Sequence, residues 1–126
     1  MKNKFKWCDN SLIYGPFFCL CLTEKEYKRQ IKRCGIKNPS TFLNKNANAT
    51  CHHLTNSQGK LCCIVCLGDY SNHSNLEIYG LLIHEAVHIW QQFKDWMGED
   101  KPSVEFEAYS IQAISQELIE SFDKQK

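Results

Sequence analysis

The chain has 126 residues, with 15 Lys and Arg against 14 Asp and Glu and a formal net charge of +1. This length predicts a single domain over residues 1–126 with a modest core, and it leaves no room for a separate substrate domain. The sequence has no apolar run of the roughly 18 residues that a membrane-spanning helix needs. We therefore expect a globular domain with no membrane partner.

The near-neutral balance conceals an asymmetry between the two parts of the chain. Residues 1–50 carry ten Lys and Arg against three Asp and Glu, whereas residues 51–126 carry five against eleven. The basic side chains gather in one segment, at Lys25, Lys28, Arg29, Lys32, Arg33 and Lys37. Such a segment can attract nucleic acid or an acidic partner. A solvated helix face produces the same pattern more often, so the sequence gives no clear nucleic-acid partner.

The first regular elements that we expect are a strand and a helix. Residues 17–22 are apolar and favour a short buried strand. Thr23 and Glu26 match a capping box, in which each residue's side chain bonds the other's backbone N–H. This pattern predicts a helix over residues 24–34, with Gly35 as its C-terminal stop.

The start of the chain resembles a secretory signal only in part. Residues 1–6 are basic and residues 12–22 are mostly apolar, which is the order found in a signal peptide. Gly15 and Pro16 interrupt the apolar run, however, and no small-residue cleavage pattern follows it. We therefore expect a cytoplasmic protein, whose thiols stay reduced.

The chain contains eight cysteines. An even count would suggest disulfides in a secreted domain. In a reducing compartment we expect buried free thiols instead, because five of the eight lie in the apolar runs around residues 19–21 and 62–66. Cys63 and Cys66 have the spacing of a zinc-binding pair, but the alternation of a strand would send their side chains to opposite faces.

A β-hairpin is expected in the middle of the chain. Residues 50–54 and 61–67 favour strands and flank a turn-rich segment over 56–60. The second run is apolar at every position, as in a strand that is buried on both faces. A polar loop follows it, so the small sheet should contain about three strands and precede the longest helical pattern of the chain.

That helical pattern carries the most informative residues, the H-E-x-x-H motif formed by His84, Glu85 and His88. Ser74 and Glu77 match a capping box and predict the start of the helix. On a helix the two histidines stand at positions i and i+4, so both imidazoles project from one face and supply half of a tetrahedral zinc site. Glu85 lies about 100° around the helix, where it can reach a metal-activated water without binding the metal.

The apolar residues of this helix recur every three or four positions and predict a core-facing stripe. They are Tyr79, Leu82, Ile83, Ala86, Val87, Trp90, Phe93 and Met97. The stripe leaves His84, Glu85 and His88 roughly opposite its centre, where they would face a cleft. The plainer interpretation is a pair of surface histidines on a solvated face, and the pattern downstream argues against it.

A catalytic zinc site usually has three protein ligands and a water. After Gly98 the chain turns into a second helical pattern, near whose start stand Glu105 and Glu107. Either carboxylate could reach the ion if the two helices form an antiparallel pair. A site with three histidines would instead need His52, His53 or His73.

These residues together resemble the gluzincin metallopeptidases, in which H-E-x-x-H is followed by a ligand glutamate on the next helix. Residues 105–109, Glu-Phe-Glu-Ala-Tyr, match the E-x-x-A part of that family's downstream pattern and place Glu105 in the ligand position. Tyr109 stands where the family often has an aspartate that orients the first histidine. More narrowly, residues 60–120 resemble small phage-encoded metallopeptidases, which would act in the host cytoplasm.

The resemblance implies a compact α+β, zincin-like domain that hydrolyses a peptide or protein substrate. His84, His88 and Glu105 would hold Zn²⁺, with Glu107 as the alternative third ligand. Glu85 would act as the general base, and Tyr109 is a candidate donor to the oxyanion. Two other interpretations stay open at this point: a non-catalytic zinc-containing protein that binds a host or partner protein, and a nucleic-acid binder in which the motif is incidental.

Overall fold

The computed structural model describes residues 4–9 and 17–126. Residues 12–16, the first part of the signal-like apolar run, lie outside these ranges. The elements in chain order are β1 (Cys8–Asp9), β2 (Phe17–Cys21), α1 (Glu24–Arg33), β3 (Ala49–Thr55), β4 (Leu61–Leu67), a single 3₁₀ turn (Tyr70–Asn72), α2 (Asn75–Met97) and α3 (Val104–Gln125). The protein therefore has the α+β architecture that the sequence predicts.

The strands form one mixed sheet in the order β1-β2-β4-β3. The central pair β2 and β4 is parallel, whereas β1 and β3 are antiparallel to their neighbours. Three strands of five to seven residues match the expected sheet, and the two-residue β1 extends it. Strand β3 is consequently an edge strand of the sheet.

The expected hairpin is formed by β3 and β4, and its turn fixes the register between them. The Asn56 backbone N–H donates to the carbonyl of Lys60 at 2.9 Å, and the Asn56 side-chain oxygen accepts from two further N–H groups of the turn. In the resulting register His53 lies opposite Cys63. Because side chains alternate along a strand, this register decides which residues of the two strands share a face.

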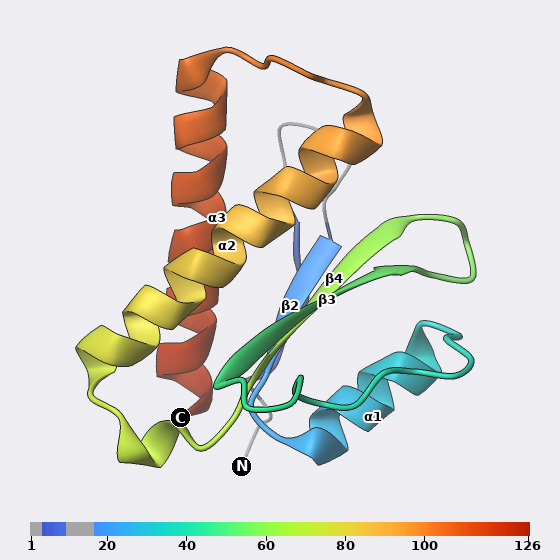
Figure 1. Ribbon diagram of the computed structural model, residues 1–126. Helices are drawn as coiled ribbons and strands as arrows, with labels where there is room; N and C mark the ends of the chain where they lie inside the picture. The colour runs from blue at the N-terminus through green and yellow to red at the C-terminus, as the bar shows by residue number, and fades with distance from the viewer. Residues whose placement is uncertain (1–3, 10–16) are drawn as a thin grey trace.

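The helices cover the two faces of the sheet unequally (Figure 1). Helices α2 and α3 pack on one face around a core that includes Phe18, Leu20, Val65, Leu82, Trp90, Leu118 and Phe122. Helix α1 packs on the other face, over Cys19, Cys21, Ile64 and Cys66 with its own Tyr27 and Ile31. All eight cysteines are free, and all except Cys51 are buried, as expected for thiols that serve as small apolar groups. Cys63 and Cys66 do lie on opposite faces.

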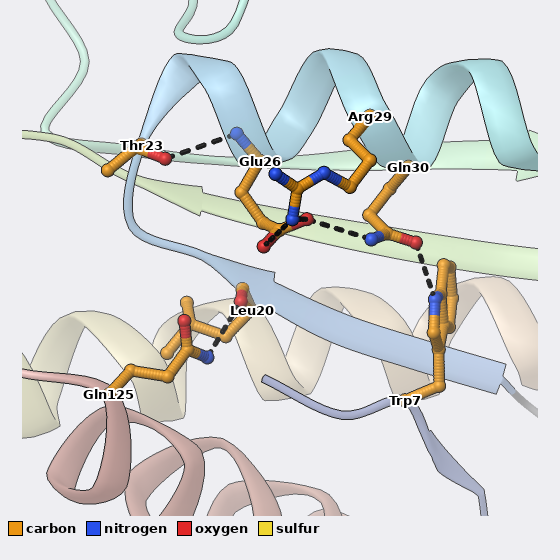
Figure 2. A network of polar contacts seen from close by, with 7 residues as sticks. All are labelled: Trp7, Leu20, Thr23, Glu26, Arg29, Gln30 and Gln125. Carbon is orange, nitrogen blue, oxygen red and sulfur yellow. Dashed lines mark hydrogen bonds and ion pairs between the residues drawn. The ribbon is translucent and has the colours of Figure 1, made fainter. Parts of the chain in front are cut away.

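Helix α1 begins as predicted, but only half of its capping box forms. The Thr23 hydroxyl accepts from the Glu26 N–H at 3.1 Å. The Glu26 carboxylate instead accepts from the Gln30 amide at 2.9 Å, and Gln30 in turn accepts from the Trp7 indole N–H at 2.9 Å. This chain of bonds fastens the segment before β1 to the helix (Figure 2).

A second contact fastens the end of the chain to the sheet. The Gln125 amide donates to the carbonyl of Leu20 in β2 at 3.0 Å, across 105 positions of sequence (Figure 2). Helix α3 begins just after Ser103, whose hydroxyl caps its first turn, and its buried residues start at Ser110.

Helix α2 has both predicted ends. Ser74 and Glu77 form a complete capping box, and Gly98 adopts a left-handed conformation with φ of 75° that ends the helix. The buried face differs from the predicted stripe: Ile83 is 45% exposed, whereas Ile78 and Ile89 are buried. The face is rotated because β3 and β4 cover one side of α2 and α3 covers another.

Within residues 4–9 and 17–126, no helix is both long enough and apolar enough to cross a membrane.

Candidate metal centre

The two histidines of the motif converge on one point beside α2. His84 and His88 are exposed and lie one turn apart, and their Nε2 atoms are 3.2 Å from each other. Two nitrogens bound to one tetrahedral zinc at about 2.0–2.1 Å would be separated by about 3.3 Å. The two nitrogens are within hydrogen-bond distance, and their separation is also close to the one around a shared metal ion.

The orientation of His88 is set by a further hydrogen bond. Its Nδ1 lies 3.1 Å from the side-chain oxygen of Gln91. An N–H at Nδ1 that donates to this oxygen leaves the lone pair at Nε2, on the side of His84. Metal-binding histidines are generally oriented in this way by a partner on the second ring nitrogen.

The sequence predicts that Glu85 faces away from the core. In the structure Glu85 is buried instead, with 6% of its surface exposed. Strand β3 packs on α2, and Glu85 lies on the side of the helix that faces β3 residues such as Cys51. Burial raises the pKa of the Glu85 carboxyl, and the nearby imidazoles, His88 and His84 first, partly offset this effect. A buried carboxylate beside two imidazoles is a favourable position for a general base.

The motif opens into a cavity of about 340 Å³ between α2 and the edge strand. Its lining residues are Asn44, Ala49, Thr50, Cys51, His53, His84, Glu85 and His88. A neighbouring hollow of about 540 Å³ shares Ala49, His84 and Glu85 with it. We call the side formed by His84, Glu85 and His88 the helix wall of the cavity. A larger hollow of about 820 Å³ lies at α1, but its lining is mainly apolar and lysine side chains.

The opposite side of the cavity contains a second group of metal-binding residue types, Cys51, His53 and Cys63, which we call the strand wall. One ligand atom from each of the three lies within 4.8 Å of the other two, so the group could hold a metal ion. Hydrogen bonds from Cys51 and His53 keep the pKa of the buried Cys63 thiol below its usual value. The Cys63 thiol in turn raises the pKa of His53.

Of the three additional histidines considered from the sequence, His53 is the one that lines the cavity with the motif. His52 points to the other face of the sheet, where its Nε2 lies 3.0 Å from the carbonyl of Phe42 and its ring stacks on Tyr27. His73 lines the neighbouring hollow of about 540 Å³, and its Nδ1 is 3.4 Å from the Glu77 carboxylate.

The carboxylates of α3 are not gathered with the motif histidines. Glu107 accepts from the Trp90 indole N–H at 2.9 Å, and Trp90 is on the buried side of α2, away from His88. Glu105 is exposed in the first turn of α3 and is not among the residues that line the cavity. Tyr109 is 65% exposed and does not line it either. The role of Glu105 as a ligand therefore stays a prediction.

Sequence reasoning found the helix wall but missed the strand wall. The signal that could have found it is the alternation Cys51-x-His53, which puts a thiol and an imidazole on one face of a strand. Adding Cys63 requires the register of the hairpin, which no local spacing reveals. Comparison of the chain with protein-family models, with curated proteins and with solved structures finds no match.

Proposed function

We propose that the protein is a zinc-dependent peptide hydrolase whose reaction centre is the helix wall. The observation that carries this proposal is the pair of Nε2 atoms on His84 and His88, 3.2 Å apart and next to the buried Glu85. His84 and His88 would hold Zn²⁺, and Glu105 is the third ligand that the sequence pattern predicts. The zincin-like character of the fold is part of this proposal.

A zinc ion held here would supply Lewis acidity and an activated water for attack on a carbonyl group. Glu85 would accept the proton of the attacking water and later deliver it to the leaving amine. The burial that raises the pKa of Glu85 makes the carboxylate a stronger base than an exposed glutamate. Glu85 stays outside the set of ligands because its side chain leaves the helix at a different angle from the two imidazoles.

The edge strand supports a peptide as the substrate. In the described sheet β3 pairs with β4 on one side only. An extended peptide can add to such an edge through backbone hydrogen bonds, which gives affinity without dependence on sequence. A peptide lying along β3 would pass over the cavity that contains Glu85.

The proposal is tested with a proteome-derived peptide library and the Glu85→Gln variant. Loss of the general base should lower cleavage by about 10²–10⁴-fold, while zinc content and fold stay intact. Asp95→Asn, which changes an exposed carboxylate on the same helix, is the matched control and should cleave like the wild type. Equal cleavage by the wild type and Glu85→Gln would contradict the proposed role of Glu85.

The second candidate is a non-catalytic zinc-containing protein that binds a partner protein. It is favoured by the position of Glu105, which does not line the cavity and so leaves the helix wall with two ligands. Zinc binding by the wild type without cleavage of any library member would favour this candidate over the hydrolase.

A further inference from the structure

The strand wall has no part in the hydrolysis proposed above. Cys51 and His53 stand two positions apart on β3, and Cys63 lies opposite His53 on β4. The three side chains therefore project from the same face of the hairpin, toward α2. Their donor atoms lie within 4.8 Å of one another.

The separations of these atoms match a shared tetrahedral ion. The His53 Nδ1 is 3.5 Å from the Cys63 Sγ and 4.0 Å from the Cys51 Sγ. A sulfur at about 2.3 Å and a nitrogen at about 2.0–2.1 Å from one tetrahedral zinc would be about 3.6 Å apart. The first separation agrees with this value, and the second exceeds it by a few tenths of an ångström.

The surroundings of the group meet two further requirements of a metal site. The three ligands stand on paired strands whose register is fixed by the turn at Asn56, so the backbone holds them in place. Cys51 and His53 also line the cavity, which gives an ion a route from solvent to the fully buried Cys63. Three protein ligands would leave the fourth position of a tetrahedral ion to water.

We propose that the strand wall is a second zinc site, in which Cys51 Sγ, His53 Nδ1 and Cys63 Sγ bind Zn²⁺ separately from His84 and His88. Two thiolates and an imidazole favour zinc over magnesium or calcium, which prefer oxygen ligands. Binding releases a proton to solvent from each thiol that is not already ionised, and no oxidant or reductant takes part.

The site that we propose uses other donor atoms than the helix wall. His53 faces Cys63 through Nδ1, whereas His84 and His88 face each other through Nε2. The second site does not depend on the proposed hydrolase activity. An ion there would link β3 to β4 beside the cavity.

Titration with Co²⁺ under a non-thiol reductant tests the proposal, because only thiolate ligands give an intense charge-transfer band in the near ultraviolet. The wild type and the His84→Ala/His88→Ala variant should both show this band. Cys51→Ser and Cys63→Ser should lose most of its intensity. Cys62→Ser, which changes the neighbouring thiol on the opposite face of β4, is the matched control and should keep it.

A cysteine variant that misfolds would also lose the band, so His53→Ala provides a second test. His53 is exposed, and its removal leaves the core intact. This variant should keep the circular dichroism spectrum of the wild type and weaken Co²⁺ binding at the thiolate site by at least about 10-fold. The proposal is overturned if the wild type gives no thiolate band, or if the band survives in both Cys51→Ser and Cys63→Ser. Loss of the band in the His84→Ala/His88→Ala variant would also overturn it, because the two groups would then form one site.

Discussion

The two walls of the cavity carry similar metal-binding chemistry but are assembled in different ways. The helix wall comes from five consecutive residues, and the spacing of one helical turn alone brings the Nε2 atoms of His84 and His88 to 3.2 Å. The strand wall comes from two strands, and its three ligands meet only because the hairpin pairs in one register. The zinc affinity of the helix wall should therefore depend on its side chains alone. The zinc affinity of the strand wall should depend on its side chains and also on the pairing of β3 with β4.

Loss of a histidine from the helix wall should have the largest effect on zinc binding. In His88→Ala the helix wall keeps one imidazole, and its zinc affinity should fall by more than about 100-fold, since even outer-shell changes cost about 10–100-fold. The strand wall should keep its ion. His73→Ala is the matched control, because His73 lines the neighbouring hollow and its side chain contacts Glu77 and not the two motif histidines. Competition against a chelator of known zinc affinity measures the zinc affinity of both variants. Equal affinity in the wild type and His88→Ala would exclude the helix wall as a zinc site.

A smaller difference in zinc affinity should distinguish Glu105 from Glu107 in the first turn of α3. Glu105→Gln should weaken zinc binding more than Glu107→Gln, because the E-x-x-A pattern favours Glu105 and the Glu107 carboxylate is engaged by Trp90. Glu107→Gln should instead lower the melting temperature slightly through the weakened bond to Trp90. The reverse order in a zinc competition titration would move the third ligand to Glu107.

Gln91 should contribute less to zinc affinity than the proposed ligands do. Gln91→Ala removes the oxygen that orients His88 but leaves every proposed ligand, so zinc affinity at the helix wall should fall by roughly 10-fold. Gln92→Ala, which changes the next residue on α2, serves as its control. A Gln91→Ala variant with wild-type affinity would show that the bond to His88 has no role in metal binding.

The smallest effect concerns stability and pH in the metal-free protein. Folding raises the pKa of Glu85 above its value of about 4.3 in the unfolded chain. The folded state therefore favours the protonated form, and stability from Glu85 is lost as the pH rises through the folded-state pKa. Metal-free Glu85→Gln should melt above the wild type at pH 7, and the difference should vanish below about pH 4. A wild type that melts above the variant at pH 7 would contradict the burial of this charge.

The sequence predicts the elements and the helix wall because both depend on local patterns. The capping box at Ser74, the stop at Gly98 and the hairpin around residues 56–60 are confirmed in the structure. The burial of Glu85 and the strand wall could not be predicted, because each depends on contacts between segments far apart in the chain. His52 and His53 illustrate this limit: they are adjacent in sequence, yet one stacks on Tyr27 and the other lines the cavity.

We expect the helix wall to hold a metal ion beside Glu85. The most direct test is the zinc content of the Cys51→Ser/Cys63→Ser variant, which lacks the strand wall, after purification without chelator. We expect about one zinc per chain in this variant and none when His84→Ala and His88→Ala are added to it. A folded Cys51→Ser/Cys63→Ser variant that carries no zinc and takes none up would contradict the claim.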